Sequence, residues 1–132
     1  MFLNRLQNDE KIAFLEIAHH IARCDGKLCN KEEEIISAYC TEMTINDITY
    51  DDTKFDLNIA LSKITSTISQ KIIILEIMAL IYSDDILHHE EIKLINKMIE
   101  TFGLNQNISV VYAQWSKAML SLTIQGEALI NL

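Results

Sequence analysis

Apolar residues recur every three or four positions along most of the chain, which is the spacing of amphipathic helices. The pattern predicts a first helix over about 7–24 and a second from about 30 to 43, with an Asp-Gly turn at 25–26 between them. Asn30 stands where an N-cap is expected, and Glu33 follows it as in a capping box. The side chains predicted to face the core here are Ala13, Phe14, Ile17, Ala18, Ile21, Cys24, Ile35, Ile36, Tyr39 and Met43.

Residues 44–53 are polar and β-branched, which predicts a connection between two halves of the chain. A third helix is predicted over about 54–68, capped by Asp51 or Asp52. Residues 72–83 are apolar almost all round, as expected of a central, buried helix. The face shared within the third helix consists of Leu57, Leu61, Ile64 and Ile68.

Two more helices are predicted, one over about 89–102 that ends at Gly103 and a last long one. A short tail containing Gly126 would then finish the chain. The pattern therefore predicts a single all-α domain over 1–132, with six or seven helices. The last long helix places together Ile108, Val111, Trp115, Ala118 and Leu122.

The amino-acid composition and the net charge disfavour several classes of function for this chain. The 132 residues contain no proline and three glycines, so the glycine-rich loops that hold phosphates are missing. Nineteen acidic against eleven basic residues give a net charge of −8, which disfavours nucleic acid and anionic membranes and favours cations or basic protein surfaces. The opening segment 1–10 is polar, unlike a signal peptide, and the apolar run 72–82 is too short to span a membrane.

The number and positions of the cysteines indicate the cellular compartment of the protein. Cys24, Cys29 and Cys40 are odd in number, so they cannot all pair within the chain. Cys24 and Cys40 also stand at apolar helical positions. We therefore expect free thiols and a cytoplasmic location.

Two stretches of the chain read alike. Residues 14–18 precede Asp25, with Glu32 seven positions later, and residues 74–78 precede Asp84, with Glu91 seven positions later. The offset between the copies is 60 residues at the first glutamates and 59 at the aspartates. This internal repeat predicts two antiparallel helical hairpins, near 10–43 and 70–102, related by an approximate two-fold axis.

The repeat carries a resemblance to a known family. The run Ile21-Ala22-Arg23-Cys24-Asp25-Gly26, followed by Glu32, resembles the signature of the TerB-like (tellurite resistance) family, and the run 81–85, followed by Glu91, resembles it again. The second copy departs by having Asp85 in place of glycine and histidines at 88–89. The resemblance implies an internally duplicated all-helical, non-enzymatic cytoplasmic module, associated with stress, whose acidic residues bind a divalent cation.

Six acidic residues are candidates for that cation, which would be Ca²⁺ or Mg²⁺ because both prefer oxygen ligands. Four follow from the resemblance, and the matching places in the two copies add Glu16 and Glu76. Glu76 is the only charged side chain between Lys71 and Asp84, so a cation, a lysine, a helix N-terminus or a proton must satisfy it. The predicted metal ligands are Glu16, Asp25, Glu32, Glu76, Asp84 and Glu91.

Other chemistries fit less well. An EF-hand starting at Asp25 would have Lys27, Cys29 and Ile36 at positions three, five and twelve, so it lacks its ligands. No CxxC or HExxH spacing indicates zinc, and no nucleophile stands in a triad context. Two function classes remain: a cation-binding module, or a metal-free helical domain that docks a protein through its acidic surface and the apolar tail Ala128–Leu132.

Overall fold

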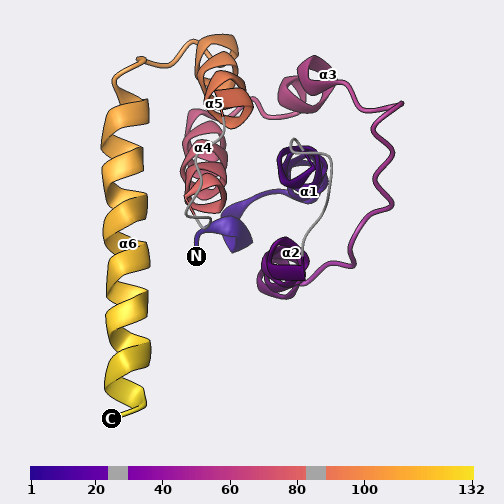
Figure 1. Ribbon diagram of the computed structural model, residues 1–132. Helices are drawn as coiled ribbons and strands as arrows, with labels where there is room; N and C mark the ends of the chain where they lie inside the picture. The colour runs from indigo at the N-terminus through magenta and orange to yellow at the C-terminus, as the bar shows by residue number, and fades with distance from the viewer. Residues whose placement is uncertain (24–29, 83–88) are drawn as a thin grey trace.

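The computed structural model describes residues 1–23, 30–82 and 89–132, and every regular element in these ranges is a helix (Figure 1). The predicted all-α class, with six or seven helices, is confirmed. In the described ranges, no helix is long and apolar enough to cross a membrane. The elements are η1 (Leu3–Arg5), a 3-10 helix, and the α-helices α1 (Asn8–Ala22), α2 (Asn30–Met43), α3 (Leu57–Ser62), α4 (Thr67–Ile81), α5 (His89–Thr101) and α6 (Ile108–Ile130).

The core is organised around α4, which contacts α1, α5, α6 and η1. Its Ile73, Ile74 and Ile77 are fully buried, so the prediction of a central buried helix is confirmed. From α1, Phe14 is fully buried and meets the ring of Tyr39 on α2 edge-on, with 5.1 Å between the ring centres. Cys24 lies outside the described residues, and Ile35 and Tyr39 are partly buried. The other side chains predicted to face the core from the first two helices are buried: Ala13, Phe14, Ile17, Ala18, Ile21, Ile36 and Met43.

The predicted hairpins correspond to the neighbouring pairs α1–α2 and α4–α5. Their turns, with the Asp-Gly pair at 25–26, Asp84 and Asp85, lie outside the described residues, so the two-fold relation between the hairpins stays a prediction. α5 ends as expected, because Gly103 adopts a φ of 69°, which a glycine reaches without a steric cost. Of the three cysteines, Cys40 is a buried free thiol, and the other two fall outside these ranges.

The third helix differs from its prediction. α3 covers only Leu57–Ser62, and a separate helix, α4, begins at Thr67. Asp56, rather than Asp51 or Asp52, is the N-cap of α3, because its side chain accepts the N–H groups of Asn58 and Ile59. Ser66 caps α4, so Ile68 belongs to the next helix and is exposed instead of sharing a face with Leu61.

The end of the chain also differs from its prediction. The expected short tail is helical, because α6 continues through Gly126 to Ile130. In Figure 1, α6 lies against α4 and α5 along its first half, and its C-terminal half extends past the other helices. Of the residues predicted to lie together on the last long helix, Ile108 and Trp115 are partly buried, whereas Val111, Ala118 and Leu122 are exposed.

Gly126 weakens this extension of α6. A Cβ placed on Gly126 would meet no atom within 4 Å. We therefore expect Gly126→Ala to raise the local stability of the last turns by roughly 0.5–1 kcal/mol, the helix preference of alanine over glycine. Hydrogen exchange of the amides at 120–130 measures this effect. Equal exchange in the two proteins would contradict it.

Candidate functional site

Glu76, the isolated acid of α4, is bound by the start of the chain. Its side chain is 8% exposed, and Oε1 accepts the N–H of Phe2 at 2.9 Å and the α-ammonium of Met1 at 3.1 Å. Glu42 of α2 binds the same ammonium and accepts the N–H of Leu3 at 2.8 Å. We call this group, Met1, Phe2, Leu3, Glu42 and Glu76, the N-terminal clasp.

The charges of the clasp shift the pKa values of their neighbours. Burial alone would lower the pKa of the Met1 ammonium, but the hydrogen bonds and charges of Glu42 and Glu76 raise it above its ordinary value. Burial raises the pKa of the Tyr39 hydroxyl, and the same two carboxylates raise it further. The positive charge beside Glu76 is thus supplied by the chain itself, through the Met1 ammonium, which was not among the partners that the sequence analysis named.

The six predicted metal ligands are only partly placed. Asp25 and Asp84 lie outside the described residues, and nothing is described of the Glu32 side chain. Glu16, on α1, is half-buried, with Lys63 Nζ at 3.8 Å, whereas Glu76 belongs to the clasp. Within the described part of the chain, no three or more histidine, cysteine, aspartate or glutamate side chains are grouped to hold a metal ion.

A second polar group lies at the C-terminal end of α1. His19 is buried, its Nδ1 lies 2.7 Å from Arg23 Nη1, and its Nε2 lies 2.8 Å from Asp47 Oδ1. Arginine can only donate, so Nδ1 accepts and Nε2 carries the proton that it donates to Asp47. The guanidinium of Arg23 also lies 4.9 Å from the ring centre of Tyr50. These contacts hold the irregular segment 45–56 against α1.

His20 extends this group with aromatic contacts. Its ring stacks on Phe55 at 4.5 Å between centres, and Nδ1 lies 2.8 Å from the Tyr50 hydroxyl. Burial lowers the pKa of His20, against the smaller raising effect of the Asp52 charge. The fold therefore keeps this ring neutral at neutral pH.

The lowered pKa of His20 predicts that the stability of the fold depends on pH in the acidic range. Because the folded protein binds the His20 proton more weakly than the unfolded chain does, stability is lost as the pH falls below about 6.5, the ordinary histidine value. We expect His20→Gln to flatten the melting profile between about pH 5 and 7. An unchanged slope in the variant would contradict this role of His20.

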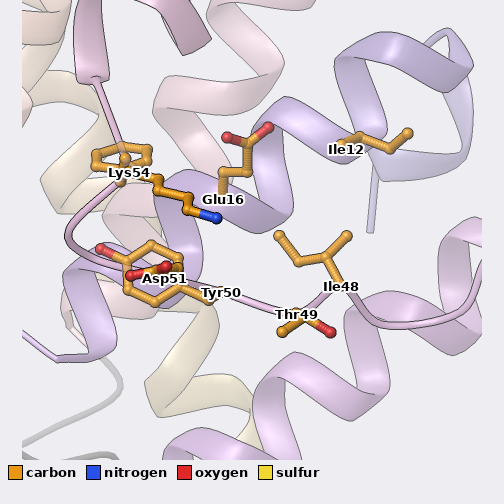
Figure 2. A pocket seen from close by; sticks show the side chains of 8 residues that line it. Ile12, Glu16, Ile48, Thr49, Tyr50, Asp51 and Lys54 are labelled. Atoms are coloured by element: carbon orange, nitrogen blue, oxygen red, sulfur yellow. The ribbon is translucent and has the colours of Figure 1, made fainter.

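A small pocket lies beside this group. Figure 2 shows Glu16 and Lys54 at one side of it and Ile12 and Ile48 at the other, with Tyr50 below. Its volume is about 260 Å³. Pockets for dedicated small ligands are usually larger, about 300–1,000 Å³. The pocket lies between α1 and the 45–56 segment.

Most of the exposed large apolar side chains belong to α6. Of the twelve large apolar side chains exposed in the described residues, eight lie on α6 or directly after it. Only Lys117 and Glu127 are charged between 108 and 132, and Lys117 lies over the ring of Tyr82. The eight apolar residues are Val110, Val111, Leu120, Leu122, Ile124, Leu129, Ile130 and Leu132.

Sequence reasoning missed several of these residues. The charge of the Met1 terminus, 75 residues from Glu76, has no local signal, and Glu42 looks like an ordinary acid near a helix end. The His19–Asp47 contact spans 28 residues and was equally hidden. The length of α6 had a signal, because the apolar spacing continues beyond Gly126 to Leu129 and Leu132.

Comparisons with known proteins add no relative. No family model, no curated protein and no solved structure matches the chain. The TerB-like resemblance therefore depends on the motif residues alone, and function is argued from the surfaces described above.

Proposed function

We propose that this chain is a helical interaction domain that docks a protein partner through the uncovered side of α6. The observation that carries this proposal is the concentration of exposed apolar side chains on one helix, with Leu122 59% and Leu129 69% exposed. A patch of this kind on a folded domain marks an interaction surface. This is the metal-free function class of the sequence analysis, with the docking surface enlarged from the tail Ala128–Leu132 to most of α6.

The N-terminal clasp favours the metal-free interaction domain over a cation site at Glu76. A metal ion at Oε1 of Glu76 would have to displace the Met1 ammonium and the N–H of Phe2, which already bind this oxygen. The free thiol of Cys40 supports a reducing compartment, so we place the domain in the cytoplasm, as the TerB-like resemblance implies.

Site-specific photocrosslinking in cells tests the docking surface. We expect a benzophenone residue at Leu122 to give a discrete protein adduct, and the same residue at the exposed Lys93 of α5 to give none. The adduct should disappear when Leu129→Ser is added, because the same face is then weakened. No adduct, or the same adducts from both positions, would overturn the proposal.

A second candidate function is binding of a divalent cation by the acidic residues of the internal repeat. What supports it is the repeat itself, in which Glu91, 8% exposed in the first turn of α5, matches Glu32. If Glu91 binds a cation, saturating Ca²⁺ or Mg²⁺ at 100 times the Kd stabilises the fold by about 2.7 kcal/mol. Thermal melts of the wild type and Glu91→Gln measure this, and a wild type without a metal response would exclude it.

A further inference from the structure

Building on the proposed docking role of α6, we propose that its partner is a second copy of this chain, joined by a parallel two-helix coiled coil. The proposal follows from the spacing, exposure and charge of one row of residues on α6. We call this row the seam. It consists of Val111, Trp115, Ala118, Leu122, Gln125, Leu129 and Leu132.

The seam has the spacing of a coiled coil. Its members follow one another at intervals of four and three residues in strict alternation, from Val111 to Leu132. A repeat of this kind averages 3.5 residues per turn and keeps one apolar row facing a partner helix. With 1.5 Å of rise per residue, the helical part of the row, from Val111 to Leu129, is about 27 Å long, and Leu132 follows directly after the end of α6, so that the row covers three heptads.

The seam is also open to a partner. Val111 is 60% exposed, Leu122 and Leu129 are similarly exposed, and Leu132 is 99% exposed. Trp115 contacts the body of its own chain through the ring of Phe2, with 6.1 Å between the ring centres. In Figure 1, α4 and α5 lie against one side of α6 and leave the opposite side uncovered. A second helix can therefore approach the seam along its whole length.

Charge favours a second copy as the occupant. The positions that flank a coiled-coil seam select the partner through their charges. On α6 these positions are all uncharged, and the segment 108–132 carries one lysine and one glutamate, so the net charge of −8 belongs to the rest of the chain. A helix that pairs with this seam should also be uncharged at its flanking positions. The α6 helix of a second copy is uncharged at these positions. The flanking residues are Tyr112, Gln114, Met119, Ser121, Gly126 and Ala128.

Gln125 indicates the register and direction of the pair. It is the one polar member of the seam and is exposed in the single chain. In a parallel pair in register, the two Gln125 amides meet and hydrogen-bond to each other. In any other alignment, each amide keeps its bond from Nε2 to Ser121 Oγ at 3.2 Å, but its remaining polar groups lie against apolar side chains, which is costly.

Analytical ultracentrifugation of the whole chain tests the proposal. We expect a reversible monomer–dimer equilibrium, because a three-heptad interface lies near the lower end of stable interfaces, about 1,200 Å² in total. Leu122→Ser should weaken the dimer by roughly 100-fold or more, because each dimer loses two buried leucines. Ile124→Ser is the matched control: Ile124 is equally exposed on the same helix but lies outside the seam, so the dimer should be kept.

Crosslinking determines the direction of the pair. A benzophenone residue at Leu129 of the purified dimer should react with the tryptic peptide 118–132 of the other copy. Reaction with the peptide 98–117 would overturn the parallel arrangement, because residue 129 then lies opposite the beginning of α6.

Three outcomes would overturn the proposal and separate it from the general docking role. A chain that stays monomeric, but whose Leu122 crosslinks to a different protein in cells, is an interaction domain with another partner. A monomer that binds vesicles of phosphatidylcholine and phosphatidylglycerol, and loses this binding equally with Leu122→Ser and Ile124→Ser, uses α6 on lipid. A monomer without either property contradicts both proposals.

Discussion

We expect Glu76→Gln to lower the free energy of unfolding by roughly 1–3 kcal/mol, the range for losing a charged hydrogen bond at a mostly buried site. Glutamine keeps an oxygen that can accept the N–H of Phe2, but it removes the negative charge that faces the Met1 ammonium. The loss stays moderate because Glu42 still binds the ammonium. For a chain of this length, the melting temperature should fall by roughly 4–12 °C.

The matched control is Glu42→Gln, which leaves the ammonium with Glu76. We expect a smaller loss from it, because Glu42 is 28% exposed at its side chain and Glu76 only 8%. An N-terminal tag, which replaces the ammonium by an amide, should destabilise the wild type and add little to Glu76→Gln. A Glu76→Gln protein as stable as the wild type would show that the clasp contributes nothing.

The clasp also predicts how stability depends on pH. The folded protein raises the pKa of the Met1 ammonium, so it binds this proton more tightly than the unfolded chain does. The contribution is therefore fully present below about pH 8 and is lost as the pH rises through the folded pKa. Melts of the wild type and Glu76→Gln between about pH 7 and 10 should converge at the alkaline end.

Phe14→Ala should have the largest effect on stability, a loss of roughly 3–5 kcal/mol. The ring is fully buried in α1 and stacks edge-on with Tyr39, so truncation leaves a cavity and removes the aromatic contact. Chemical denaturation measures the loss from the transition midpoint at constant slope.

Ile12→Ala is the control for this position. Ile12 stands on the same helix but is 44% exposed, so its truncation should cost well under half as much. Equal losses at Phe14 and Ile12 would contradict the role of core packing, because alanine is the better helix former at both positions.

Periodic burial made most of the fold predictable from the sequence. The apolar side chains of α1 and the all-apolar surface of α4 repeat within single helices, so their burial follows from neighbouring residues alone. α3 was predicted too long because Ile64 and Ile68 continue its spacing, whereas Ser66 between them caps a new helix. Gly126 was interpreted as a breaker, but one glycine costs only about 1 kcal/mol, and the helix continues through it.

The candidate site was harder to predict, because its contacts join residues far apart in the chain. The isolation of Glu76 among apolar residues correctly indicated that it needs a partner. That this partner is the Met1 ammonium depends on how α2, α4 and η1 pack together, which no local pattern encodes. The exposed side of α6 was misjudged for the same reason, since a periodic row shows that a face is apolar but not which surface covers it.

The clasp has a consequence for the order of folding. Its two ion pairs close loops of 41 and 75 residues, so they cannot form before α2 and α4 are assembled. Interactions that form after the folding transition state change the unfolding rate and leave the folding rate almost unchanged. The contacts of the clasp are thus among the last to form, and their loss is an early step of unfolding.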